Sequence, residues 1–251
     1  SIGKFSRQRF FKKNNQLMDT KTSFTFESIE AQFSEAIKQG YHIITCAEFH
    51  QRKKSGTLEP KTLINRIDVD FSIKKAEKIG EFMNRLRIKA SFFIRLHAPE
   101  YNPFSFENYR IIKYLIESGH EIGYHSEVID ESEIWNEDAE ECLKRDIDII
   151  NKIFNIKILG TAGHGGMTEF NNLDFWINRK PEDFGLLYEA YSWMNDTFYI
   201  SDSEWIRWKC YDKGNLRKGD IRSLGEHAKD NHEIIYSLIH PASYFNNHFY
   251  E

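Results

Sequence analysis

The stretch LINRIDVDF, residues 63–71, decides the fold of this 251-residue chain. Its nearly continuous run of apolar residues is typical of a strand buried on both faces, as in a parallel sheet. A helical pattern follows over 73–86, and a second apolar strand follows over 90–96. A strand, a helix and another strand in this order predict a βαβ unit, and hence a parallel sheet.

The same alternation continues on both sides of this unit. Before it we expect a helix with Ser28 as its N-cap, then a strand over 41–45 and a surface loop over 51–61. After it the pattern predicts helices over 106–117 and 138–154, and strands over 121–124, 156–161 and 233–239, with less regular aromatic segments over 186–191, 197–201 and 205–208. No linker divides the chain, so we predict an N-terminal extension over 1–27 and a single α/β domain over 28–251.

Composition and charge exclude several classes of protein. Hydrophobic residues make up 40% of the chain and aromatic residues 15%, which excludes a disordered protein. The 34 basic residues against 38 acidic ones give a net charge of −4, so no basic field exists to bind nucleic acid. The three cysteines show no C-x-x-C spacing, which favours a reducing compartment, and we predict a cytoplasmic location. No window reaches the roughly 18 consecutive apolar residues of a membrane span.

Ionisable side chains stand at the ends of four predicted strands, where parallel α/β proteins place their reactive groups. Asp68 and Asp70 alternate along the first of these strands, so both point to one face of the sheet. His125 ends a short strand, His164 lies among glycines after the next one, and His240 closes the last. Two like charges buried together are costly unless a cation neutralises them, which favours a metal site.

Each of these residues also has a structural interpretation. Arg66 and backbone amides would satisfy the two aspartates without a metal. A histidine at a strand end is often only hydrogen-bonded, and the glycines around His164 fit a flexible turn. Four strand ends that each offer an ionisable group nevertheless favour a functional site over four unrelated structural roles.

In order and spacing, these residues resemble the polysaccharide deacetylases of the NodB-homology class, which act on N-acyl or O-acyl carbohydrates with a divalent metal. The resemblance is to an atypical branch and covers residues 28 to 241. It rests on the segments 43–45, 66–70, 90–93, 119–125, 160–166 and 238–241. It implies a distorted (β/α) barrel with mainly parallel strands.

The resemblance also implies a role for four of the candidate residues. Asp68 is similar to the family's catalytic base, and His240 to its general acid. Asp70 is similar to the aspartate metal ligand, and His125 to the first histidine ligand. Charge, rather than the resemblance, suggests the role of Arg66, which would orient Asp68 and keep it ionised through a charge-assisted bond.

One position departs from the family pattern. Typical members carry a second histidine four positions after the first, but this chain has Ile129 there, which cannot bind metal. We predict that His164 replaces it as a metal ligand, with Glu127 and Asp130 as weaker candidates. Aspartate and histidine ligands around an open water position favour zinc, although nickel, cobalt or iron bind similar sites.

An aromatic segment over 193–208 is the predicted place of substrate contacts. Flat aromatic faces bind sugar rings, so we predict that Trp205 and Trp208 contact the substrate. Arg207 would bind a phosphate or carboxylate of a nucleotide-linked or acidic sugar. The aromatic residues of a barrel rim or core have the same pattern, so the alternative is a purely structural role.

The leading functional hypothesis is a metal-dependent hydrolase that removes an acetyl or formyl group from a carbohydrate. Its substrate would be an amino sugar or glycan of surface polysaccharide or glycan precursor biosynthesis. The alternative is a catalytically inactive barrel that binds glycan or a protein partner, and the missing histidine supports it. A third hypothesis is a metal-assisted hydrolase on the same barrel that acts on a non-sugar amide.

Overall fold

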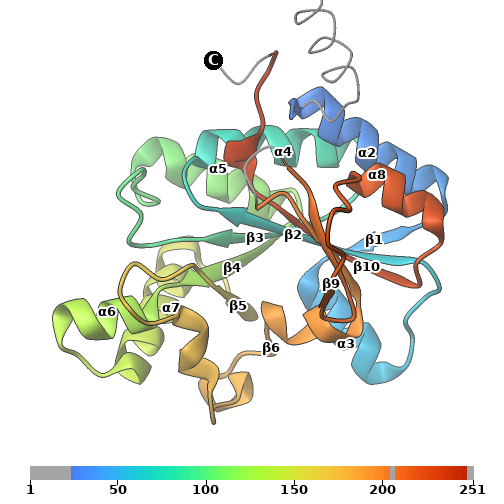
Figure 1. Cartoon of the computed structure of the whole chain (residues 1–251). Coiled ribbons are helices and arrows are strands. Elements are labelled where there is room, and N and C mark those ends of the chain that lie inside the picture. The colour runs from blue at the N-terminus through green and yellow to red at the C-terminus, as the bar shows by residue number, and fades with distance from the viewer. Residues whose placement is uncertain (1–23, 204–206, 248–251) are drawn as a thin grey trace, which may run out of the picture.

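A computed structural model describes residues 24–203 and 207–247 of the chain. In this part of the chain strands and helices alternate, as Figure 1 shows. The helices are α2 (Phe26–Lys38), α3 (Cys46–Ser55), α4 (Ile73–Arg85), α5 (Phe106–Glu117), α6 (Val128–Trp135), α7 (Ala139–Phe154) and α8 (Leu224–His227). The strands are β1 (His42–Ile44), β2 (Thr62–Val69), β3 (Ser91–Ile94), β4 (Glu121–Ser126), β5 (Gly160–Gly163), β6 (Tyr188–Glu189), β7 (Phe198–Ser201), β8 (Lys209–Asp212), β9 (Asn215–Leu216) and β10 (Ile234–Ile239).

The strands form a mainly parallel sheet. Within the described residues its order is β6-β5-β4-β3-β2-β10-β7-β8-β9, with β1 paired to β2. All pairings from β6 to β7 are parallel, and the two that join β7, β8 and β9 are antiparallel. This arrangement confirms the predicted α/β class with mainly parallel strands.

The central strand and its helix follow from the sequence pattern. Every residue of β2 is buried, as its run of apolar residues predicts. Ser72 caps α4 by accepting a hydrogen bond from the backbone of Lys75, and Ile73, Ala76, Ile79 and Met83 are buried at helical spacing. Helices α2, α4 and α5 lie along one side of the sheet (Figure 1). None of the helices in the described residues is long and apolar enough to cross a lipid bilayer.

The first helix begins earlier than the sequence predicts. Thr25, not Ser28, is its N-cap, because the Thr25 hydroxyl accepts a hydrogen bond from the Ser28 backbone. Phe24 is buried against the rings of Trp208 and Tyr244. The packed part of the chain therefore includes residues that the sequence pattern places in the extension over 1–27.

Short helices, among them α3 and α6, occur where the sequence predicts none. Helix α3 covers half of the predicted loop over 51–61, because Thr45 caps it and Phe49 is buried under it. Its remaining face is charged, which hides the apolar periodicity. Helix α6 follows β4 directly, and its first residue, Val128, is buried.

Candidate functional site

A cavity of about 280 Å³ opens at the carboxyl ends of β2, β4, β5, β7 and β10. Asp68, Asp70, His125, His164 and His240 all line it. These residues come from four strand ends that are far apart in the sequence. The parallel register brings the ends to one edge of the sheet, so the structure unites the five side chains that the sequence analysis selected.

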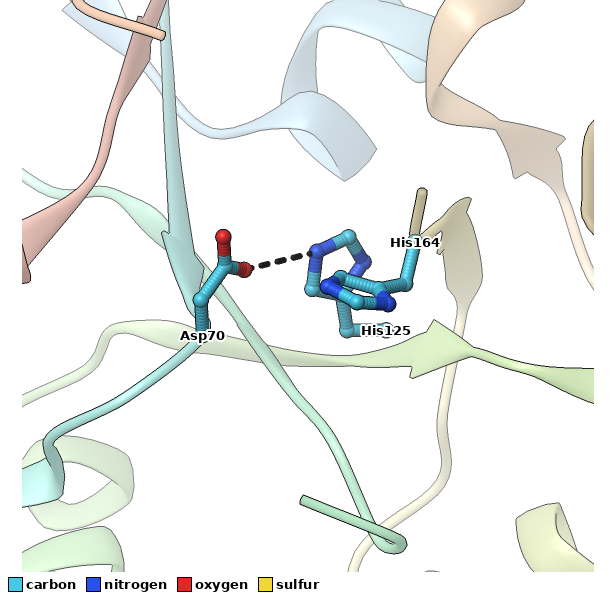
Figure 2. Close-up of side chains that lie close together, drawn as sticks. All are labelled: Asp70, His125 and His164. Carbon is cyan, nitrogen blue, oxygen red and sulfur yellow. Dashed lines mark hydrogen bonds and ion pairs between the residues drawn. The ribbon is translucent and has the colours of Figure 1, made fainter. Parts of the chain in front are cut away.

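Asp70, His125 and His164 converge on one point of this cavity, as Figure 2 shows. One ligand atom of each residue lies within 4.8 Å of the others. The Oδ1 atom of Asp70 is 3.1 Å from Nε2 of His125, and the two imidazole rings meet edge to face with centroids 5.0 Å apart. A carboxylate and two imidazoles form a donor set that fits zinc or a similar divalent metal.

The backbone of β5 fixes the orientation of His125. Its Nδ1 atom lies 2.8 Å from the carbonyl oxygen of Ala162, its partner in the β4–β5 pairing. A ring nitrogen that donates to a carbonyl leaves the lone pair on the other nitrogen. Nε2 of His125 is therefore the atom available to a metal beside Asp70.

Glu127 and Arg95 support the ring of His164. Glu127 Oε1 lies 3.4 Å from Nδ1 of His164 and accepts hydrogen bonds from Nε and Nη2 of Arg95 at 3.1 and 2.7 Å. Burial is the largest influence on the pKa of Glu127 and acts to raise it. His164 and Arg95 together outweigh it and lower that pKa to about 2. Glu127 is therefore a carboxylate committed to these two side chains.

Asp130, the other weaker candidate for a metal ligand, has a different task. It accepts hydrogen bonds from the backbone nitrogens of Met167 and Thr168 and from the side chain of Asn172, at 2.8 to 3.0 Å. Asp130 thus fastens the loop that carries His164, and it is not among the residues that line the cavity. The structure places His164, rather than Asp130 or Glu127, beside Asp70 and His125.

Arg66 and Asp68 form a buried two-point ion pair. Nε of Arg66 donates to Oδ1 of Asp68 at 2.8 Å and Nη2 donates to Oδ2 at 2.6 Å, with side-chain exposures of 0% and 1%. Burial is the largest influence on the pKa of Asp68 and acts to raise it, but Arg66 and then His125 outweigh it and lower the pKa. Asp68 is therefore ionised, in the orientation that the sequence analysis attributes to Arg66.

Asp202 is a site residue that the sequence analysis missed. It is fully buried, accepts hydrogen bonds from the His240 backbone nitrogen at 2.9 and 3.1 Å, and lies 2.5 Å from His240 Nδ1. Burial is the largest influence on the pKa of His240 and acts to lower it, but Asp202 outweighs it and raises that pKa to about 9. Asp202 directly follows β7, so the rule of inspecting strand ends also applies to it.

Within the described residues, the structure supports none of the three predicted substrate contacts as a residue that lines the cavity. Trp205 lies outside the described residues. Arg207 is exposed and does not line the cavity. Trp208 is only 2% exposed and packs in the core against Phe24, with ring centroids 5.9 Å apart. This placement leaves no ring face for a sugar and corrects the predicted role of Trp208.

Two other aromatic residues line the cavity instead. Phe71 directly follows Asp70 and is 41% exposed. Tyr191 covers the guanidinium of Arg66, whose central carbon lies 4.1 Å from the ring centre. The sequence analysis missed both, although Phe71 is adjacent to a predicted ligand.

Comparison with known proteins finds similarity in structure alone. No protein-family model and no curated protein sequence matches the chain. Among solved structures, a Streptococcus pyogenes deacetylase, PplD, in complex with acetate is 12% identical, with a TM-score of 0.44 over 59% of this chain and 66% of that one. A mutant of BA3943, a CE4 family pseudoenzyme with restored enzymatic activity, is 17% identical, with a TM-score of 0.45 over 74% of this chain and 62% of that one. The chitin deacetylase from the fungal pathogen Colletotrichum lindemuthianum is 15% identical, with a TM-score of 0.34 over 69% of this chain and 84% of that one. The chain thus spans less than two thirds of the length of the first two.

Proposed function

We propose that this chain is a metal-dependent hydrolase that removes an N- or O-linked acetyl or formyl group from a carbohydrate. The pathway would be the biosynthesis of a surface polysaccharide or a glycan precursor. The observation that carries the proposal is the content of the cavity, where a metal-binding set, a carboxylate and a histidine all face the same space. Metal-assisted hydrolysis of an amide uses these three components: an electrophilic centre, a base and an acid.

Asp70, His125 and His164 are the residues that would hold the metal. When bound, a divalent metal such as zinc supplies a Lewis acid that polarises an acyl carbonyl and lowers the pKa of water to roughly 7. The three side chains contribute one charge and two neutral donors, and this set leaves a coordination position open to water and substrate.

Asp68 and His240 would transfer the protons. Asp68, held ionised by Arg66, accepts a proton from the attacking water. Because Nδ1 of His240 is hydrogen-bonded to Asp202, Nε2 is the atom that would donate a proton to the departing nitrogen or oxygen of the sugar. The base and the acid thus have different ion-pair partners. Arg66 favours the deprotonated form of Asp68, and Asp202 favours the protonated form of His240.

The lining of the cavity supports a carbohydrate as the substrate. The ring of Phe71 is exposed beside the ligand Asp70, and Tyr191 lies beside Asp68. An aromatic face next to carboxylates and imidazoles matches a sugar ring, which has an apolar face and a hydroxyl-bearing edge.

Metal stoichiometry tests the proposed ligand set. After saturation with zinc and removal of the excess, Asp70→Ala, His125→Ala and His164→Ala are each expected to contain about one zinc ion per chain less than the wild type. The matched controls are His42→Ala and Asp196→Ala, whose side chains are half exposed or more. Elemental analysis gives the metal content. An unchanged zinc content in the His125 variant would refute the site, and an unchanged content in the His164 variant alone would refute the third ligand.

A second candidate function is carbohydrate binding without hydrolysis. The observation that favours it is that both oxygens of Asp68 already accept hydrogen bonds from Arg66 at a site where the carboxylate is 1% exposed. A base held this firmly takes up a proton reluctantly. Acetate release from N-acetylated chito-oligosaccharides separates the two functions, because the alternative predicts binding of the oligosaccharide with no acetate released.

The Asp202–His240 pair leads to a prediction about pH. A general acid acts only while it is protonated, so activity falls as the pH rises through its pKa. Because Asp202 raises the pKa of His240, Asp202→Asn is expected to shift the alkaline limb of the kcat/KM profile to lower pH. Asp196→Asn, at an exposed position, is the matched control. An alkaline limb that stays in place in Asp202→Asn would contradict the assignment of His240 as the acid.

A further inference from the structure

A second group of metal-ligating side chains lies apart from the cavity, where β8, the following loop and α8 meet. Cys210 belongs to β8, Asp220 to the loop, and His227 is the last residue of α8. One ligand atom of each lies within 4.8 Å of the others. None of the three lines the cavity of the candidate active site.

His227 is the residue whose surroundings call for a ligand. Its side chain is 1% exposed, and neither ring nitrogen has a hydrogen-bond partner within the described part of the chain. The ring packs against Phe198, with centroids 4.6 Å apart. A neutral imidazole has one donor and one acceptor nitrogen, and burying both without partners is costly. A metal ion bound to one ring nitrogen gives that nitrogen a partner and so removes its share of the cost of burial.

The spacing of the His227 and Asp220 donor atoms matches that of two zinc ligands. Nε2 of His227 lies 3.4 Å from Oδ1 of Asp220, yet the two atoms form no hydrogen bond. Bonds of about 2.0–2.1 Å to a tetrahedral zinc place neighbouring nitrogen and oxygen ligands about 3.3–3.4 Å apart, with the metal between them. Such ligands point at the metal rather than at each other. The buried Cys210 supplies the soft third donor that zinc prefers.

The residues around the group would support a bound metal. Nδ1 of His227 lies 3.6 Å from a carboxylate oxygen of Asp230, the position of the carboxylate that commonly orients a ligating histidine. Arg222 donates to both oxygens of Asp220, at 3.1 and 2.9 Å, and to Asp230 at 2.8 Å. The backbone nitrogen of Arg222 also donates to Oδ1 of Asp220, at 3.2 Å. These bonds orient the two carboxylates and leave a lone pair on Oδ2 of Asp220 and on Oδ2 of Asp230. A divalent ion and Arg222 together balance the thiolate of Cys210 and the two carboxylates.

We propose that Cys210, Asp220 and His227 bind a zinc ion, with water in the fourth position, and that this ion holds β8, the loop over 217–223 and α8 together. On binding, the thiol of Cys210 releases its proton to solvent and the thiolate forms the bond to the metal. The site is structural, and it is independent of the proposed hydrolase activity.

An ion on the opposite nitrogen of the same imidazole is the competing arrangement. Nδ1 of His227, Asp230 and His232 also bring ligand atoms within 4.8 Å of one another. This set contains no sulfur and is more exposed, since Asp230 is on the surface. A signal from a metal–thiolate bond therefore distinguishes the two arrangements.

Cobalt spectroscopy tests the proposal in the double variant Asp70→Ala/His125→Ala, which lacks the ligands of the cavity. None of the described residues that line the cavity is a cysteine, so a thiolate-to-cobalt charge-transfer band in the near ultraviolet reports on the second site alone. We expect Co²⁺ to produce this band at about one ion per chain and Zn²⁺ to abolish it. Cys210→Ala and His227→Gln, made in the same background, are expected to lose the band.

Cys142→Ala is the matched control, because Cys142 is also a buried free cysteine but belongs to none of the metal-ligating groups of the described residues. This control is expected to keep the band. Zn²⁺ is also expected to raise the Tm of the double variant and to leave that of its Cys210→Ala derivative unchanged. A folded double variant without the band, or a band that persists in Cys210→Ala, would overturn the proposal whether or not the chain is a hydrolase.

Discussion

His240→Gln is expected to slow acetate release from an N-acetylated sugar by about 10²–10⁴-fold, the usual contribution of a general acid. An amine leaves a tetrahedral intermediate only after it has gained a proton, and His240, whose pKa Asp202 raises to about 9, lines the cavity. Glutamine has no proton to transfer at neutral pH. Steady-state kcat/KM values for the variant and the wild type measure the effect.

The leaving group provides the internal control for this variant. In a phenyl acetate whose phenol is acidic, the phenolate leaves without being protonated. The rate at which His240→Gln hydrolyses this ester is therefore expected to fall much less than its rate with the amide. His42→Gln, at a half-exposed position outside the cavity, is expected to match the wild type with both substrates. An equal loss with amide and ester would mean that His240 supports the site in some way other than proton donation.

Arg66→Met is expected to lower the free energy of unfolding by about 3–5 kcal/mol, because it leaves the carboxylate of Asp68 buried without its partner. Methionine approximates the length of the arginine stem, so the loss of charge is the main change. The midpoint and slope of urea denaturation give the stability. Arg85→Met, which removes a guanidinium from an exposed pair with Glu30, is the matched control and is expected to cost 1 kcal/mol or less, as is typical of surface pairs at about 0–1 kcal/mol.

The pH dependence of stability adds a second test of the same pair. The folded state lowers the pKa of Asp68, so the pair's stabilisation is complete above the ordinary aspartate pKa of about 3.9. It is lost as the pH falls through the lowered value. The difference in stability between the wild type and Arg66→Met is therefore expected to narrow as the pH falls. The double variant Arg66→Met/Asp68→Asn should recover part of the loss, and a recovery of zero would argue against a direct coupling of the two residues.

The elements with strong apolar periodicity are the ones that the sequence predicts best. The helix predicted over 106–117 is α5 with the same bounds, and the buried run over 63–71 is β2 within two residues at its end. Helix α3 has no comparable pattern, because only three of its residues are buried and the rest are mostly charged. Its stability comes from the Thr45 cap and from Phe49, which packs against Trp193.

The residues of the candidate site also differ in how far local sequence pattern identifies them. Asp68 and Asp70 alternate in β2, and His125 and His240 stand at the ends of other strands, so local pattern and the strand-end rule identify them. The choice of His164 over Glu127 and Asp130 depends on which side chain the β4–β5 pairing and Arg95 direct into the cavity. The sequence already favours His164, because it follows the next predicted strand end, and the structure places it beside Asp70 and His125.

The sequence by itself determined the α/β class, the strand ends and the chemistry of the side chains placed there. Hydrophobic periodicity and residue type can both be read from a short stretch of the chain. The tertiary structure alone decided which of these side chains meet. Asp202 reaches His240 across 38 residues because β7 pairs in parallel with β10, and Trp208 turns into the core because Phe24 packs against it. Such contacts depend on register and packing between distant segments, which no window of sequence contains.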